Sequence, residues 1–142
     1  MKNLALRLLL SLFLFSSISL FAQEKMDKST SHTMKGYLVD KMCATGMAKK
    51  APDEAMAAAA KHEKSCALKE GCQDSGFGLM SEGVFYKFDD KGSKKALALM
   101  KKTHKKNEIM VAVIGNHDGG ILRVTSIKEV KTLGSKKETK TM

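Results

Sequence analysis

Residues 40–72 read DKMCATGMAKKAPDEAMAAAAKHEKSCALKEGC and separate a short β-type run from the rest of the chain. All three cysteines of the chain, Cys43, Cys66 and Cys72, lie in this stretch, and His62 precedes Cys66 by four residues. Apolar runs of strand length stand on both sides, which indicates one long insertion into a small β domain. Thiol and imidazole groups bind soft metals and the thiols also form disulfides, so the insertion is the candidate functional segment.

Five short runs with β-type composition surround the insertion. They are MKGYLVD at 34–40, FGLM at 77–80, VFYKF at 84–88, EIMVAVIG at 108–115 and ILRVTSIKEV at 121–130. Between the third and fourth runs, SKKALALMKKTHKK (93–106) repeats apolar residues at helical spacing and predicts an amphipathic helix. The turn signals SEG and NHDGG each join two neighbouring runs into a hairpin.

Within the insertion, the sequence predicts a loop followed by one helix. CATGMAKK (43–50) contains glycine and favours a loop. Pro52 is followed by two acidic residues, which is typical of a helix start, and the alanine-rich sequence predicts a helix over 52–65. If that helix continues through Cys66, His62 and Cys66 are one turn apart on the same face.

The order of these elements predicts an α+β, mostly β fold. Five strands with a helix between the third and fourth match the OB-fold, a small partly open five-stranded barrel. In that fold the connection between the first two strands is a common binding loop, and here it carries the cysteines. Another α+β arrangement of the same elements is the alternative.

The beginning of the chain has the features of a secretory signal peptide. Lys2 and Arg7 give a positively charged region before the apolar run LLLSLFLF (8–15). A cleavage site is expected after Ala22. The run is shorter than the roughly 20 residues that a membrane-spanning helix needs. We therefore expect export to the periplasm or the medium, with no stable membrane span. The expected division is signal peptide 1–22, flexible leader 23–33, OB-like domain 34–131 and basic disordered tail 132–142.

The chain is strongly basic. Its formal net charge of +10 at pH 7 falls to +8 when Lys2 and Arg7 leave with the signal peptide. Such an excess attracts polyanions, but the lysines are spread over loops, a helix and the tail. Together with export, this pattern favours a solvated surface over a nucleic-acid partner, and the oligomeric state stays open.

Four longer runs carry a family resemblance: GYLVDKMCA, HEKSCALKEGCQDSGFGLM, VFYKFDDKGSKKALALMKK and IMVAVIGNHDGGILRVTSIKEV. Together they resemble a family of small exported bacterial proteins of unknown function, over residues 35–130. The resemblance implies an OB-like barrel with a signal peptide and a Cys/His segment after the first strand. It implies no activity and assigns no functional residue.

The leading functional hypothesis is a metal-binding module that uses Cys43, His62, Cys66 and Cys72. Three thiolates and one imidazole are an accepted tetrahedral set for zinc, and the same ligands suit copper. Met42 and Met47 flank Cys43, and thioether ligands would favour Cu(I). No CxxC pair is present, so the spacing itself is a weak signal.

A structural disulfide is the second hypothesis. An exported chain favours disulfides, and Cys66–Cys72 or a bond from Cys43 to either would link the insertion to the domain. Such a bond contributes about 2–4 kcal/mol to stability. The odd number of cysteines argues against it, because one thiol stays unpaired.

Two further functional classes are an enzyme and a ligand-binding barrel. In an enzyme, His62 would activate the Cys66 thiol as a nucleophile. However, neighbours on one helix face point the same way and do not converge on a substrate, so a non-catalytic protein is expected. His117 and Asp118 lie in a turn signal and are interpreted as turn residues. Alternatively, a ligand could bind the barrel face through the domain's aromatic residues, which are Tyr37, Phe77, Phe85, Tyr86 and Phe88.

Overall fold

The computed structural model describes residues 31–131 of the 142-residue chain. In chain order the elements are β1 (His32–Asp40), α2 (Lys41–Met47), α3 (Pro52–Lys61), α4 (Lys64–Ala67), α5 (Glu70–Ser75), β2 (Phe77–Ser81), β3 (Val84–Phe88), α6 (Asp90–Lys102), β4 (Met110–Asp118) and β5 (Ile121–Glu129). The expected signal peptide (1–22), most of the expected leader and the expected tail (132–142) lie outside the described residues.

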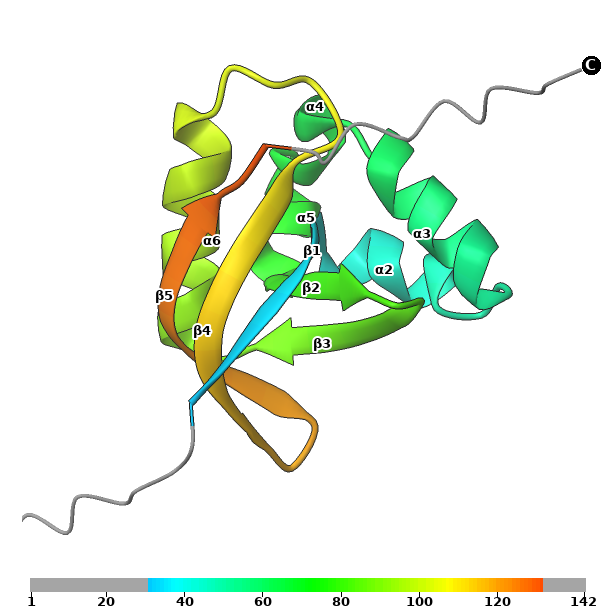
Figure 1. Cartoon of the computed structure of the whole chain (residues 1–142). Coiled ribbons are helices and arrows are strands. Elements are labelled where there is room, and N and C mark those ends of the chain that lie inside the picture. Colours follow the sequence, from blue (N-terminus) through cyan, green and yellow to red (C-terminus); the bar gives the residue numbers. More distant parts are fainter. Residues whose placement is uncertain (1–30, 132–142) are drawn as a thin grey trace, which may run out of the picture.

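The five strands form a sheet that closes on itself into a ring, in the order β1-β2-β3-β5-β4 (Figure 1). The strands pair antiparallel, except for β3 and β5, which run parallel. Pairing of β1 with β4 completes the ring. The prediction of an α+β fold with five strands is confirmed, and so is a helix, α6, between the third and fourth strands.

The interior of this closed sheet is an apolar core to which all five strands contribute. Its buried strand residues are Leu38, Phe77, Leu79, Phe88, Val111, Val113, Leu122 and Val124. Alternate residues of a strand point to opposite faces, so β4 buries Val111 and Val113 and leaves Ile114 exposed. α6 adds Ala96 and Met100 to the same core, while its lysines face outward. Burial of one face therefore fixes the register of each strand.

Two helices of the insertion, α2 and α3, cover the outer face of β1 and β2. Val39 and Met80 point away from the main core and pack in a second apolar cluster with Ala44, Ala55 and Ala59 of α2 and α3. The small alanine side chains let the two helices lie close to the sheet. As a result, β2 is buried on both faces, and α2 and α3 lie on the side of the molecule away from α6 (Figure 1). Ala67 of α4 packs in the main core instead.

Each of the two predicted hairpins contains a tight turn. Glu82 and Gly83 between β2 and β3 have φ of 52° and 79°, and Gly119 and Gly120 between β4 and β5 have φ of 55° and 83°. Positive φ at both central residues is the requirement of the two-residue turns that match strand twist. The SEG and NHDGG signals therefore indicated the hairpins correctly.

The insertion differs from its prediction. The expected loop at 43–50 is largely helical, because α2 spans Lys41–Met47. Asp40 explains this difference, since its side chain accepts a hydrogen bond from the Cys43 N–H at 2.9 Å and caps the helix. A carboxylate at the end of a strand thus starts a helix that composition alone does not favour.

The predicted single helix over 52–65 is also wrong. α3 ends at Lys61, residues 62–63 are extended, and two short helices, α4 and α5, follow. Backbone hydrogen bonds to residues 106–108 flank the break: Lys106 C=O accepts from Lys64 N–H at 2.7 Å, and Glu108 N–H donates to Ala60 C=O at 2.8 Å. These long-range bonds replace the helical bonds that a continuous helix would make.

Smaller differences concern element ends. β1 begins at His32, so the last two residues of the expected leader pair with β4. α6 begins at Asp90, capped by Asp89, and ends at Lys102, which leaves His104 outside the helix. Within residues 31–131, no helix has the length and apolar character needed to cross a membrane.

Candidate metal centre

Cys43 is positioned by the junction of β1 and α2. Asp40 is the last residue of β1, is fully buried and accepts the Cys43 N–H. The cap fixes the first turn of α2. This turn places the half-buried thiol of Cys43 close to Cys66 of α4 and to Cys72 of α5. The thiol is therefore held by the sheet and not by a mobile loop.

His62 reaches the same place from α3. It follows the last residue of that helix in an extended conformation, with φ −63° and ψ 123°, and is 9% exposed. Its Nε2 lies 3.0 Å from Oδ2 of Asp40. The two atoms are close enough for an ion pair but are not aligned as a hydrogen bond, and both are buried without a hydrogen-bond partner. The strand–helix junction thus pairs a buried carboxylate with a buried imidazole.

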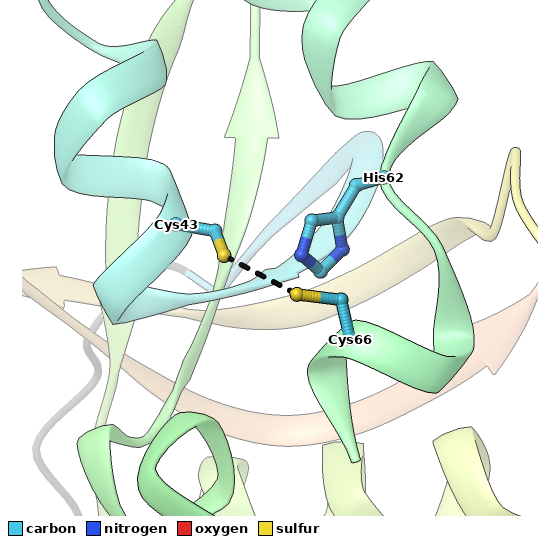
Figure 2. A group of neighbouring side chains, drawn as sticks. All are labelled: Cys43, His62 and Cys66. Carbon is cyan, nitrogen blue, oxygen red and sulfur yellow. Dashed lines mark hydrogen bonds between the residues drawn. The ribbon is translucent and has the colours of Figure 1, made fainter. Parts of the chain in front are cut away.

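Cys66 completes the group from α4. Its Sγ lies 3.8 Å from Sγ of Cys43. α4 is anchored by Lys64, whose Nζ donates to the Thr103 carbonyl at 2.7 Å. Figure 2 shows the three side chains arriving from three segments, with the imidazole beside the line joining the two sulfur atoms. The donor atoms of Cys43, His62 and Cys66 all lie within 4.8 Å of one another.

Cys72 belongs to a second group of donor atoms around Cys43. It is 6% exposed in α5, and its thiol, the Cys43 thiol and an Asp40 carboxylate oxygen lie within 4.8 Å of one another. It is not part of the group that contains His62 and Cys66. Of the four predicted ligands, the structure therefore brings three together and places Cys72 in a second group that shares Cys43.

Sequence reasoning missed Asp40. From the sequence, Asp40 is expected at the end of a strand. That position does not link its acidic side chain to Cys43, Cys66 or Cys72, which follow later in the chain. The available signal was an acid directly before a segment that becomes helical, which is the usual place for a capping residue. Recognising the cap would have indicated both α2 and a carboxylate beside the thiols.

The electrostatics of the site favour neutral thiols at Cys43 and Cys72 and an ionised Asp40. Burial, the Asp40 carboxylate and the Cys66 thiol together raise the pKa of Cys43 to about 12. Burial and Asp40 also raise the pKa of Cys72. Burial raises the pKa of Asp40 as well, but the close approach of His62 and the Cys43 N–H outweigh it, so this pKa lies below its usual value. A cation among these groups would favour the thiolates instead.

These features bear on the competing hypotheses. The three cysteines are free thiols, and the 3.8 Å between the Cys43 and Cys66 sulfurs is far longer than the roughly 2.05 Å of a disulfide bond. A thiol nucleophile needs a lowered pKa, whereas the pKa of Cys43 and that of Cys72 are raised, which argues against these two thiols in that role.

Several other residues considered from the sequence have different surroundings. Met47 packs in the second apolar cluster, and Met42 is 57% exposed. The tip of the β4–β5 hairpin carries His117, which packs edge-on against Tyr86, and Asp118, which pairs with Arg123 at 2.9 Å. His117 and Asp118 therefore each have a separate partner. They are the last two residues of β4 and pair with β5, and the turn itself is Gly119–Gly120, so the interpretation of the two as turn residues is wrong.

Comparisons with protein-family models, curated proteins and solved structures find no significant match for this chain. The family resemblance noted in the sequence therefore stays a prediction.

Proposed function

We propose that this protein is a small non-catalytic metal-binding module in which Cys43, His62 and Cys66 hold one thiophilic ion, zinc or copper. The observation that carries the proposal is the convergence of two sulfurs and one imidazole within 4.8 Å from three separate segments. Thiolate and imidazole are the preferred ligands of these ions.

The sulfur–sulfur distance supports a shared ion. Two sulfurs bound to one zinc ion at about 2.3 Å, with the tetrahedral angle between them, lie about 3.8 Å apart. The Cys43 and Cys66 sulfurs are separated by 3.8 Å. An ion would therefore bind both sulfurs with little movement of α2 or α4.

Asp40 supports the ligand role of His62. A ligating histidine usually directs its second ring nitrogen toward a carboxylate, which sets the ring orientation and strengthens the ligand. Nε2 of His62 already lies 3.0 Å from Asp40. With Nε2 assigned to Asp40, Nδ1 becomes the nitrogen for the ion. The ionised carboxylate also adds negative charge that a bound cation would offset.

The site would leave a coordination position open. Three protein ligands leave a fourth tetrahedral position for solvent or for a ligand of another molecule. Cys43 and Cys66 are half-buried, so their ion would remain reachable from solvent. This combination fits an ion that is bound and passed on better than a permanently enclosed structural ion.

The compartment and fold belong to the same proposal. The strand order with its parallel β3–β5 pair, and α6 between β3 and β4, support an OB-like barrel with the metal segment in its first connection. The apolar run near the beginning of the sequence supports export to the bacterial envelope or the medium. Metal binding or handling outside the cytoplasm is the resulting role.

The test is the intact mass of the purified protein under native and denaturing conditions, with thiols counted after chelation. A native mass higher by zinc or copper, with three countable thiols, supports the proposal. A mass lower by two hydrogens, with one thiol and no metal, contradicts it for that form. It would favour the structural disulfide instead, most directly between Cys43 and Cys66, whose sulfurs are already in contact.

A further inference from the structure

Cys43 belongs to two donor groups at once. Its thiol lies within 4.8 Å of donor atoms of His62 and Cys66, and also within 4.8 Å of donor atoms of Asp40 and Cys72. The two groups adjoin, because Nε2 of His62 lies 3.0 Å from Oδ2 of Asp40. We propose that Cys43 bridges two metal ions, with a second, inner ion held by Asp40, Cys43 and Cys72. This inference rests on the proposed function, because it adds an ion beside the first.

The inner group is built from rigid, buried parts. Asp40 is 0% exposed at the end of β1, and Cys72 is 6% exposed in α5, which packs against α2 and β1. Oδ1 of Asp40 accepts the Cys43 N–H, and Oδ2 lies 3.0 Å from Nε2 of His62. A carboxylate has about four lone-pair directions, so these two contacts leave room for a bond to an ion.

The ligands of the two groups can balance two divalent ions. When Cys43, Cys66 and Cys72 bind as thiolates, they and the Asp40 carboxylate carry four negative charges, which two divalent cations neutralise, so no net charge is left in this poorly solvated site. A thiolate sulfur has enough lone pairs to bind two thiophilic ions, so Cys43 serves as the bridge.

The two ions would differ in access. The outer ion lies between half-buried thiols, whereas the inner ion lies between side chains that are almost fully buried. We expect a chelator to remove the outer ion first and the inner ion more slowly. The inner ion would then act as a retained part of the fold, and the outer ion as the exchangeable one.

The test uses the reduced full-length protein titrated with cadmium(II), a thiophilic ion that tetrahedral thiolate sites accept. Native mass spectrometry is expected to find two cadmium ions per chain. With ¹¹³Cd, two NMR signals should appear and show scalar coupling to each other through the shared sulfur. Such coupling requires a bridging atom, so it does not depend on any variant folding.

Variants assign the inner ion. Cys72→Ser and Asp40→Asn should each reduce the cadmium count from two to one, whereas Cys43→Ser should remove the coupled pair. Asp74→Asn is the matched control, because Asp74 is an exposed carboxylate of the same short helix as Cys72. It should keep two ions.

Three results would overturn the inference. One ion in the wild-type protein at saturation leaves the proposed function standing but removes the inner ion. Two ions without coupling, or two ions retained in Cys72→Ser, place the second ion elsewhere. No bound ion in the reduced protein rejects the proposed function and this inference together.

Discussion

The sulfur atoms of Cys43 and Cys66 lie 3.8 Å apart although the residues are 23 positions apart in the chain. Hydrogen bonds fix the positions of the helices that carry these two residues. α2 is capped by Asp40 at the end of β1, and α4 is bonded to residues 103 and 106 beyond α6. The pair is therefore held from two sides of the closed sheet, as a preorganised binding site requires.

The first prediction concerns this pair. Cys43→Ser and Cys66→Ser should each lower zinc affinity by more than about 100-fold, because each removes a direct ligand and exceeds the roughly 10–100-fold effect of losing a supporting residue. Affinity is measured by competition with a chromophoric chelator under reducing conditions. Ser65→Ala is the control, since exposed Ser65 adjoins Cys66 and hydrogen-bonds only to Glu63 among the described residues. Unchanged zinc affinity in both cysteine variants would mean that neither sulfur binds the ion.

The second prediction concerns alkaline pH in the metal-free protein. The pKa of Cys43 is raised from 9.0 to about 12 in the folded state, so folding favours its neutral thiol. This contribution to stability is fully present below pH 9 and is lost as pH rises toward 12, because the unfolded chain ionises first. Denaturant unfolding in the presence of chelator and reductant should show a steady loss of stability over this window. Cys43→Ser should flatten the loss, and an equally steep loss in that variant would assign it to other groups.

The third prediction separates the two roles of Asp40. Asp40→Asn keeps an oxygen for the Cys43 N–H but removes the charge, whereas Asp40→Ala also removes the cap and should cost about 0.5–2 kcal/mol more. The pKa of Asp40 lies below its ordinary 3.8, so its charge stabilises the fold above that value. The contribution disappears as pH falls through the lowered pKa. Acid unfolding should therefore be less pH-dependent in Asp40→Asn, and an unchanged acid profile would contradict the assignment.

The fourth prediction concerns the alanine-rich face of α3. Ala59 is 2% exposed against Val39 and Met80, so Ala59→Leu should lower the free energy of unfolding by about 1–3 kcal/mol through overpacking. Ala57→Leu, on the exposed side of the same helix, should stay within about 0.5 kcal/mol of wild type. Both are compared by denaturant unfolding. Equal losses in the two variants would mean that helix propensity, and not close packing on β1, governs this face.

These contrasts show what the sequence carries and what it lacks. The strands were predictable because apolar runs of strand length, such as EIMVAVIG at 108–115, stand between turn signals, and because glycine marks both tight turns. The course of the insertion was not predictable. Alanine composition favours one continuous helix, whereas backbone bonds from residues 106–108 interrupt it at His62. Local propensity does not contain such long-range bonds.

The same limit applies to the site. Clustered cysteines and one histidine marked the correct segment, and three of the four candidates converge. The predicted reason was different, because His62 and Cys66 meet through a helix break and not along one helix face. Cys72 lies near Asp40 because α5 packs against β1, and this tertiary contact cannot be read from the spacing of the cysteines.

The last prediction concerns oxidation of the metal-free protein by a small-molecule disulfide such as oxidised glutathione. Cys43 and Cys66 should lose their two thiol hydrogens and form one disulfide, while the reagent is reduced to two thiols, because these sulfurs are already in contact. Peptide mapping should find Cys43–Cys66, with Cys72 unmodified because it is buried. The disulfide removes two ligands, so the oxidised protein should no longer bind zinc, and zinc-loaded protein should resist oxidation. Fast oxidation of the loaded form, or a dominant Cys66–Cys72 bond, would mean that the two sulfurs do not share an ion in solution.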